Sequence, residues 1–189
     1  MHEFRVQVGP AAFRIGSAWS APLEQMAELY RDYPKPDFPD FTIRLEPTTW
    51  LRRWLRPSVA IGGDYMLPDA APLPLAQGLL AAEMAMNLQM ALGWRRHLLL
   101  HASAVERNGR VLVMTGQSGS GKSTLSALLG SQGWRFMGDE FVLLDPLTGQ
   151  VASFPRLISL KNSAISAMQA AQRDARFGPL LAGTPKGDI

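Results

Sequence analysis

The stretch that decides the expected fold is "GQSGSGKST", Gly116 to Thr124. Residues 116–123 fit the pattern G-x-x-x-x-G-K-[ST] without a mismatch. An apolar run precedes the stretch, and the helix-forming run "STLSALLGSQG" overlaps its end. A strand, a glycine loop and a helix in this order are typical of a phosphate-binding loop. The alternative is a glycine turn that only caps a helix, and we expect nucleotide binding instead.

The residue types of this loop suit a polyphosphate. Glycines let the backbone wrap around an anion, and the helix N-terminus adds a partial positive charge. We expect Lys122 to reach the β and γ phosphates and the Ser123 hydroxyl to complete the shell of a Mg²⁺ ion. The sequence therefore predicts ATP and Mg²⁺ binding. The nine binding residues are Gly116, Gln117, Ser118, Gly119, Ser120, Gly121, Lys122, Ser123 and Thr124.

Such a site also needs a carboxylate, either to hold the metal or to take a proton from the nucleophile. "FVLLD" is an apolar strand that ends in Asp145, although "DPLTGQ" is also typical of a hairpin turn. "GDE" offers Asp139 and Glu140 after the short predicted strand "WRFM". These residues alone leave the choice between the two stretches open.

A histidine is predicted to lie near the loop. "LLLHASAVE", residues 98–106, and "VLVMTG" are strand-like, and "RNGR" between them predicts a type I′ hairpin turn. In this register Ala104 lies opposite Val113, and a continued ladder places His101 opposite Gly116. We weigh this catalytic position against a histidine that is merely packed or solvent-facing.

Composition indicates a globular protein. The 189 residues are 47% hydrophobic and 19% charged, which fits one domain or one domain with a small subdomain. The absence of cysteine excludes disulfides, thiolate metal sites and cysteine nucleophiles, and we expect a cytoplasmic protein. The net charge of +3 arises in residues 156–189, which carry five basic and two acidic side chains. We interpret this bias as a solvated surface and expect no nucleic-acid partner.

No membrane partner is expected either. The N-terminus "MHEFRVQVGP" lacks the pattern of a signal peptide. The most apolar long run, Leu73 to Leu92, is interrupted by Gln77, Glu83, Asn87 and Gln89. This run predicts a buried helix and not a bilayer span.

The fold class expected is α/β, in two parts. Alternating apolar residues on both sides of Gly9 and Pro10 predict a strand pair, and Ser20 and Pro22 open a helix whose apolar face holds Leu23, Met26, Ala27 and Tyr30. Residues 1–71 are predicted to form a small α+β lobe, followed by the linker-like "LPDAAPLP". Residues 72–189 are predicted to form a P-loop nucleotide-binding core with a mixed sheet.

The segment "TTWLRRWLRP", Thr48 to Pro57, interleaves tryptophans with arginines. This pattern is compatible with base stacking and phosphate contacts on a single-stranded nucleic acid. We favour the alternative that the aromatic side chains pack inward and the arginines point outward.

The stretch from "HASAVERNGR" through "GQSGSGKST" to "GDEFVLLD" resembles the core of the HPr kinase/phosphorylase family. These are bacterial P-loop enzymes that phosphorylate a serine on a small phosphocarrier protein. The sequence is still more similar to the offshoot called HprK-related kinase A. The core resemblance covers about residues 98 to 145, while "FPRLISLKNSAI", "TPKGDI" and, less specifically, the N-terminal lobe look like parts of the offshoot.

The resemblance implies a role for each matching residue. Asp139 corresponds to the family's proton acceptor, and His101 corresponds to its active-site histidine. Lys122 corresponds to the phosphate lysine and Ser123 to the magnesium hydroxyl. Glu140 takes the second acidic position, which makes it the other expected metal ligand. The resemblance therefore favours Asp139 over Asp145 and leaves Asp145 as a turn residue.

Two features depart from the family. Where the parent family has a later metal-binding glutamate, "PRLISLKNSAI" contains no carboxylate. The resemblance therefore does not carry over that metal ligand or the reverse, phosphorylase reaction. The family's catalytic arginine and substrate-engaging loop lie further along than Ile189, so we expect this chain to be a C-terminally truncated form.

The function predicted is an ATP-dependent phosphotransferase, a protein serine/threonine kinase whose protein substrate is not identified. One alternative is a regulatory module that binds ATP without transferring phosphate. Another is a small-molecule kinase, for which "RDAR", residues 173–176, is the only hint of an arginine lid. The sequence leaves open whether the protein forms a homo-oligomer.

Overall fold

The computed structural model divides the chain into two compact units, Met1–Trp94 and Arg95–Ile189. It describes residues 1–173, 175–184 and 187–189. The division lies later than the boundary expected after residue 71. The reason is that helix α2 (Gly78–Gly93) contacts strands β3 (Phe41–Pro47) and β4 (Ser58–Gly63) of the first unit. The predicted buried helix is therefore part of the N-terminal unit.

A five-stranded mixed sheet forms the first unit, in the order β1-β2-β3-β4-β5. Its other strands are β1 (His2–Val8), β2 (Ala11–Ser17) and β5 (Leu73–Pro74). Strands β1 and β2 pair antiparallel, which confirms the predicted strand pair. Strands β2 and β3 are parallel. Parallel neighbours need a crossover connection, and helix α1 (Ala21–Leu29) lies within it.

The helices of the first unit supply its core. Helix α1 begins after Ser20 with a proline in its first turn, as predicted, and buries Leu23 and Met26, whereas Ala27 is exposed. Helices α1 and α2 contact each other and the sheet. The Tyr30 hydroxyl just beyond α1 donates a hydrogen bond to Glu83 of α2 at 2.8 Å, which ties the two helices together. Among the described residues, no helix has the length and apolar character needed to cross a membrane.

Two three-stranded sheets form the second unit, in the orders β11-β10-β6 and β8-β7-β9. The strands are β6 (Leu98–Leu100), β7 (Ser103–Arg107), β8 (Arg110–Met114), β9 (Arg135–Gly138), β10 (Val142–Leu144) and β11 (Val151–Ala152). The ladders between these strands are antiparallel, and Gly138 of β9 also forms an isolated parallel bridge with Phe154. Among the strands that the structure describes, the mixed sheet lies in the first unit, whereas the sequence predicted it in the second. The β7–β8 and β10–β11 pairs are joined by short turns, which favour antiparallel neighbours because a parallel neighbour needs a long crossover.

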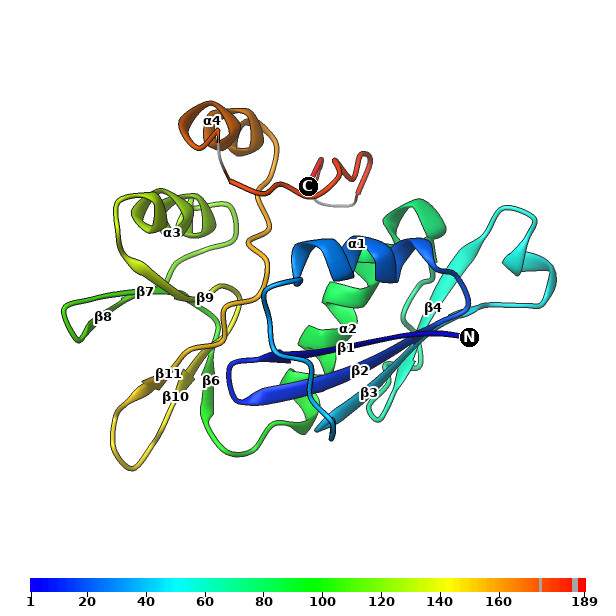
Figure 1. Cartoon of the computed structure of the whole chain (residues 1–189), viewed down its shortest axis with the longest axis horizontal. Coiled ribbons are helices and arrows are strands. Elements are labelled where there is room, and N and C mark those ends of the chain that lie inside the picture. Colours follow the sequence, from blue (N-terminus) through cyan, green and yellow to red (C-terminus); the bar gives the residue numbers. More distant parts are fainter. Residues whose placement is uncertain (174, 185–186) are drawn as a thin grey trace. The chain divides into compact units, whose positions relative to one another are not determined.

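Helices cover one of these sheets. Helix α3 (Lys122–Ser131) contacts β7 and β9, and helix α4 (Ser163–Ala171) contacts α3. Figure 1 shows α3 following the β7–β8 hairpin. The first unit also contains two short 3₁₀ helices, Leu51–Arg53 and Leu75–Gln77. The order of strand, loop and helix predicted around the glycine-rich stretch is therefore confirmed.

The predicted hairpin register is confirmed over five residue pairs, from Arg107 opposite Arg110 to Ser103 opposite Met114. The turn residues Asn108 and Gly109 have φ angles of 54° and 73°, as a type I′ turn requires. The ladder stops at Ser103, so the extrapolated pair of His101 with Gly116 is not part of it.

The predicted single strand over residues 98–106 is wrong, because the chain changes sheets within it. Leu100 of β6 pairs with Val142 of β10, whereas Ala104 of β7 pairs with Val113 and Gly138. His101 and Ala102 form the link between the two sheets. A continuous apolar pattern does not reveal such a switch, because both halves are strands.

The expectation that Trp50 and Trp54 pack inward is also wrong. Their exposed fractions are 77% and 75%, and every residue from 48 to 56 is exposed. The segment connects β3 to β4 and contains only the short 3₁₀ helix. The segment lies outside the strands and helices whose apolar residues form the core of the first unit, so its tryptophans are not packed against that core.

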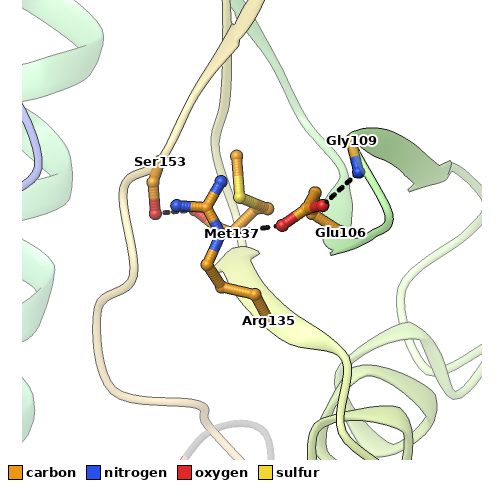
Figure 2. Close-up of polar contacts among 5 residues, drawn as sticks. All are labelled: Glu106, Gly109, Arg135, Met137 and Ser153. Carbon is orange, nitrogen blue, oxygen red and sulfur yellow. Dashed lines mark hydrogen bonds and ion pairs between the residues drawn. The ribbon is translucent and has the colours of Figure 1, made fainter.

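The side chain of Glu106 links three parts of the second unit (Figure 2). Its Oε1 accepts a hydrogen bond of 2.7 Å from the backbone N–H of Gly109 in the hairpin turn. Its Oε2 accepts a hydrogen bond of 3.0 Å from the Nε of Arg135 in β9. Glu106 therefore holds the turn of one strand pair against the neighbouring strand.

Replacement of this carboxylate gives a test of its contribution. Glu106→Ala is expected to lower the free energy of unfolding by about 1–2 kcal/mol, because a backbone donor and an arginine lose their acceptor. Chemical denaturation measures the change. The matched control is Glu3→Ala, since the Glu3–Arg5 pair at 2.8 Å is more than a third exposed on both sides. The control should change stability by less than about 0.5 kcal/mol, and equal losses in both variants would refute the structural role of Glu106.

Candidate nucleotide-binding site

The loop between β8 and α3 depends on its glycines. Gly116, Gly119 and Gly121 have φ angles of 149°, 83° and 89°, a region that residues with a side chain rarely adopt. The backbone N–H of Leu125 donates to the carbonyl of Gly121 at 2.9 Å, which starts the hydrogen-bond ladder of α3. Residues 115–121 are exposed. The loop therefore presents its backbone to solvent at the N-terminus of a helix, where anions bind favourably.

Lys122 lies folded back over this loop. Its Nζ donates hydrogen bonds to the carbonyl oxygens of Gly116 at 2.8 Å and Gln117 at 3.0 Å. The N–H of Ser120 donates to the same Gln117 carbonyl at 3.2 Å, closing a turn within the loop. Neutral carbonyl oxygens thus hold the positive charge of Lys122 beside the loop. A phosphate group there could form a charge-assisted hydrogen bond with the ammonium group.

The helix that carries the loop is attached to the sheet through a buried hydroxyl pair. The Oγ atoms of Ser103 in β7 and Ser126 in α3 lie 2.6 Å apart, and both residues are fully buried. The Ser103 hydroxyl also lies 3.4 Å from the carbonyl oxygen of Gly138 at the end of β9. Sequence reasoning missed both serines, because no local pattern pairs a strand residue with a helix residue 23 positions later.

Three of the predicted binding residues lie in the first turn of α3. These residues are Lys122, Ser123 and Thr124, and all three are half-buried.

The two adjacent acids after β9 have different surroundings. Asp139 is 4% exposed, whereas Glu140 is half-buried. Glu140 has a φ angle of 71°, which is unfavourable for a residue with a side chain. No room exists for a side chain at Gly138, since a Cβ there would lie 2.7 Å from the carbonyl oxygen of Phe141. The two adjacent acids therefore follow a tightly packed glycine and differ in their exposure to solvent.

His101 meets one of these acids. Its Nδ1 lies 3.6 Å from the Oε2 of Glu140, and 63% of the histidine side chain is exposed. Both residues occupy links between strands, so the sheet switch at His101 and the turn at Glu140 together create the contact. The sequence placed both residues in the candidate site, but it predicted a position opposite Gly116 for the histidine.

Asp145, the other candidate acid, is a turn residue. Its Oδ1 accepts hydrogen bonds from the backbone N–H groups of Leu147 at 2.8 Å and Thr148 at 3.2 Å. These two hydrogen bonds lower the pKa of the Asp145 carboxyl below its usual value. The interpretation of "DPLTGQ" as a hairpin turn between β10 and β11 is confirmed.

The expected metal ligands do not form a protein-only cage. Within residues 1–173, 175–184 and 187–189, no cluster of three or more histidine, aspartate or glutamate side chains is suited to a metal ion. A nucleotide-bound Mg²⁺ normally uses one or two protein ligands, phosphate oxygens and water. Ser123 and Glu140 therefore remain chemically suitable as predicted ligands.

Comparisons with known proteins identify no relative. No protein-family model, curated protein or solved structure matches the chain. The resemblance of residues 98–145 to the HPr kinase/phosphorylase core therefore stays a prediction from their residues.

The unfavourable backbone of Glu140 gives a prediction. Glu140→Gly is expected to be about 1 kcal/mol more stable than Glu140→Gln, since glycine adopts positive φ without steric conflict. Both variants remove the carboxylate from His101, so the glutamine variant controls for the lost contact. Thermal or chemical denaturation measures the difference. A glycine variant less stable than the glutamine variant would contradict the assignment of strain.

Proposed function

We propose that the second unit binds ATP on residues 116–124 and transfers its γ-phosphoryl group to a hydroxyl of a partner protein. In this proposal it is a P-loop serine/threonine kinase related to HPr kinase. The observation that carries it is the Lys122 ammonium group held on the carbonyls of Gly116 and Gln117, in a loop whose three glycines have positive φ. A turn that only caps a helix does not need this lysine position.

The charges of the loop suit a triphosphate. Lys122 supplies a positive charge, and the start of α3 supplies its partial positive charge at the same place. Residues 115–121 contain no acidic side chain that would repel phosphate oxygens. The Ser103–Ser126 hydrogen bond holds α3 on the sheet, so the start of the helix keeps its position when an anion binds. Mg²⁺, held by Ser123 and Glu140, would neutralise negative charge on the phosphates.

We assign Asp139 as the proton acceptor in the transfer step. The acceptor hydroxyl oxygen forms a bond to the γ phosphorus, while the bond from that phosphorus to the β–γ bridging oxygen breaks and ADP leaves. Asp139 takes the hydroxyl proton. Glu140 follows Asp139 in the chain, and its Oε2 lies 3.6 Å from the Nδ1 of His101, so a second carboxylate and an imidazole lie close to the assigned proton acceptor. Positioning and charge neutralisation supply most of the rate enhancement in transfers of this kind.

Removal of the loop lysine tests nucleotide binding. Lys122→Ala is expected to weaken ATP binding by about tenfold or more, because a charge-assisted contact to phosphate is worth about 1.5–3 kcal/mol. Isothermal titration with ATP and Mg²⁺ measures the affinity. Lys35→Ala, at an exposed position of the first unit, is the matched control and should bind like the parent. Equal affinity of the Lys122 variant and the parent would refute the binding site.

Phosphoryl transfer is tested separately from binding. Transfer of radiolabelled γ-phosphate from ATP to an added protein is the readout, and HPr, the phosphocarrier protein used by the family that the sequence resembles, is the acceptor tested first. Asp139→Asn is expected to lower the transfer rate by about a hundredfold or more while keeping ATP affinity, since the proton acceptor is lost. Asp145→Asn is the control, because Asp145 is engaged in its turn. A transfer rate unchanged in the Asp139 variant would overturn its assignment.

A second candidate function is an ATP-binding regulatory module that transfers no phosphate. The burial of Asp139 favours it, since a carboxylate with 4% exposure must become accessible to reach an acceptor hydroxyl. ATP binding that depends on Lys122, combined with no label transfer to HPr or to the protein itself, would favour the module over the kinase.

A further inference from the structure

The connection between β3 and β4, residues 48–57, carries an unusual exposed surface, which we call the tryptophan–arginine loop. Four large apolar side chains point into solvent there. Their exposed fractions are 77% for Trp50, 51% for Leu51, 75% for Trp54 and 67% for Leu55. Clusters of exposed large apolar residues mark interaction sites more often than isolated ones do.

The base of this loop is held firmly. The Trp19 indole Nε1 donates a hydrogen bond to the carbonyl of Arg53 at 3.0 Å, and an Arg53 guanidinium nitrogen donates to the carbonyl of Ala18 at 3.3 Å. The hydroxyls of Thr48 and Ser58 lie 2.9 Å apart across the start and end of the loop. These contacts fix the loop to the first unit, so its apolar side chains are presented to solvent by a structured segment.

The loop is also positively charged. Arg52, Arg53 and Arg56 are exposed, and residues 47–63 contain no acidic side chain. The apolar and cationic side chains are adjacent in the chain, so a surface that binds one kind contacts the other. The complementary surface is therefore both apolar and negatively charged.

We propose, in place of the sequence-based expectation of no membrane partner, that the tryptophan–arginine loop binds the surface of an anionic lipid bilayer. Tryptophan rings favour the headgroup level of a membrane, and leucines favour the hydrocarbon just below it. Arginine guanidinium groups bind phosphate oxygens, and each basic residue near an anionic surface adds a similar increment of affinity. The loop thus acts as a peripheral membrane anchor, independent of the nucleotide site.

The geometry favours lipid over single-stranded nucleic acid. The guanidinium carbon of Arg53 lies 5.2 Å from the ring centroid of Trp54, so one face of that ring is covered and closed to base stacking. Exposed leucines add nothing to stacking, because they have no π face.

The geometry also favours lipid over a protein partner. Every residue from 48 to 56 is exposed, so the side chains project in several directions. A bilayer interface can surround such a tip, whereas a stable protein interface needs a complementary face of about 800 Å² on each partner.

Vesicle co-sedimentation tests the proposal with the full chain. Vesicles of equal parts phosphatidylglycerol and phosphatidylcholine should bind the protein, and pure phosphatidylcholine vesicles should bind it much more weakly. High salt should reduce the binding. Brominated lipids should quench tryptophan fluorescence on binding, because the rings of Trp50 and Trp54 enter the interface.

Two double variants separate the apolar and the charged contributions. Trp50→Ser/Trp54→Ser should lower vesicle affinity by about tenfold or more and abolish the quenching. Arg52→Gln/Arg56→Gln should lower the affinity by about thirtyfold. Phe38→Ser, at a position 89% exposed in the same unit, controls for loss of an exposed aromatic ring. Lys35→Gln/Arg110→Gln, at exposed positions, controls for loss of charge. Circular dichroism checks that each variant is folded.

Three outcomes would overturn the proposal. The first is no binding to the anionic vesicles at low salt. The second is vesicle binding that neither double variant reduces beyond its control. The third is binding of a single-stranded oligothymidylate that the tryptophan variant abolishes, without vesicle binding, which would assign the loop to nucleic acid.

Discussion

The second unit depends on the buried hydrogen bond between the hydroxyls of Ser103 and Ser126. Two hydroxyls in an interior satisfy each other, whereas either one alone would be a buried polar group without a partner. The pair connects the middle strand of the β8-β7-β9 sheet to α3, and Ser103 reaches the end of β9 as well. The contacts of the Ser103 hydroxyl therefore help to position both the loop before α3 and the acids after β9.

Departures from regular strands build the rest of the candidate site. The chain changes sheets at His101 and Ala102, and it turns sharply at Glu140 with an unfavourable φ. Each departure exposes a titratable side chain at a strand end, and the two side chains meet at 3.6 Å. Residues held in sparsely populated conformations are concentrated at functional sites, because the surrounding structure must stabilise them. The glycines of the loop differ from Glu140 in this respect, because positive φ has little steric cost for glycine.

In the first unit, most apolar residues are buried where the sequence pattern predicts, and one loop is an exception. Its helices and sheet follow their apolar patterns closely, and Val6, Phe13 and Ile43 are fully buried. The tryptophan–arginine loop does not follow this rule, since its tryptophans and leucines are all exposed. Burial of an aromatic residue requires an apolar surface opposite it, and Trp50 and Trp54 meet none in the connection between β3 and β4. Exposure there concentrates apolar and cationic groups at one projecting tip.

Local rules were sufficient for the elements that depend on nearby residues. The β7–β8 register, the type I′ turn at Asn108 and Gly109 and the strand-loop-helix order around Gly116 follow from residues adjacent in the chain. Local residues left the role of Asp145 open between a turn and a site acid, and the structure places it in a turn. Tertiary structure alone decided the sheet switch at His101, the Ser103–Ser126 pair, the membership of α2 in the first unit and the exposure of Trp50 and Trp54. The physical reason is that each of these depends on which distant surface is available for pairing or packing, and a local sequence pattern specifies a preference for a surface without specifying where that surface lies.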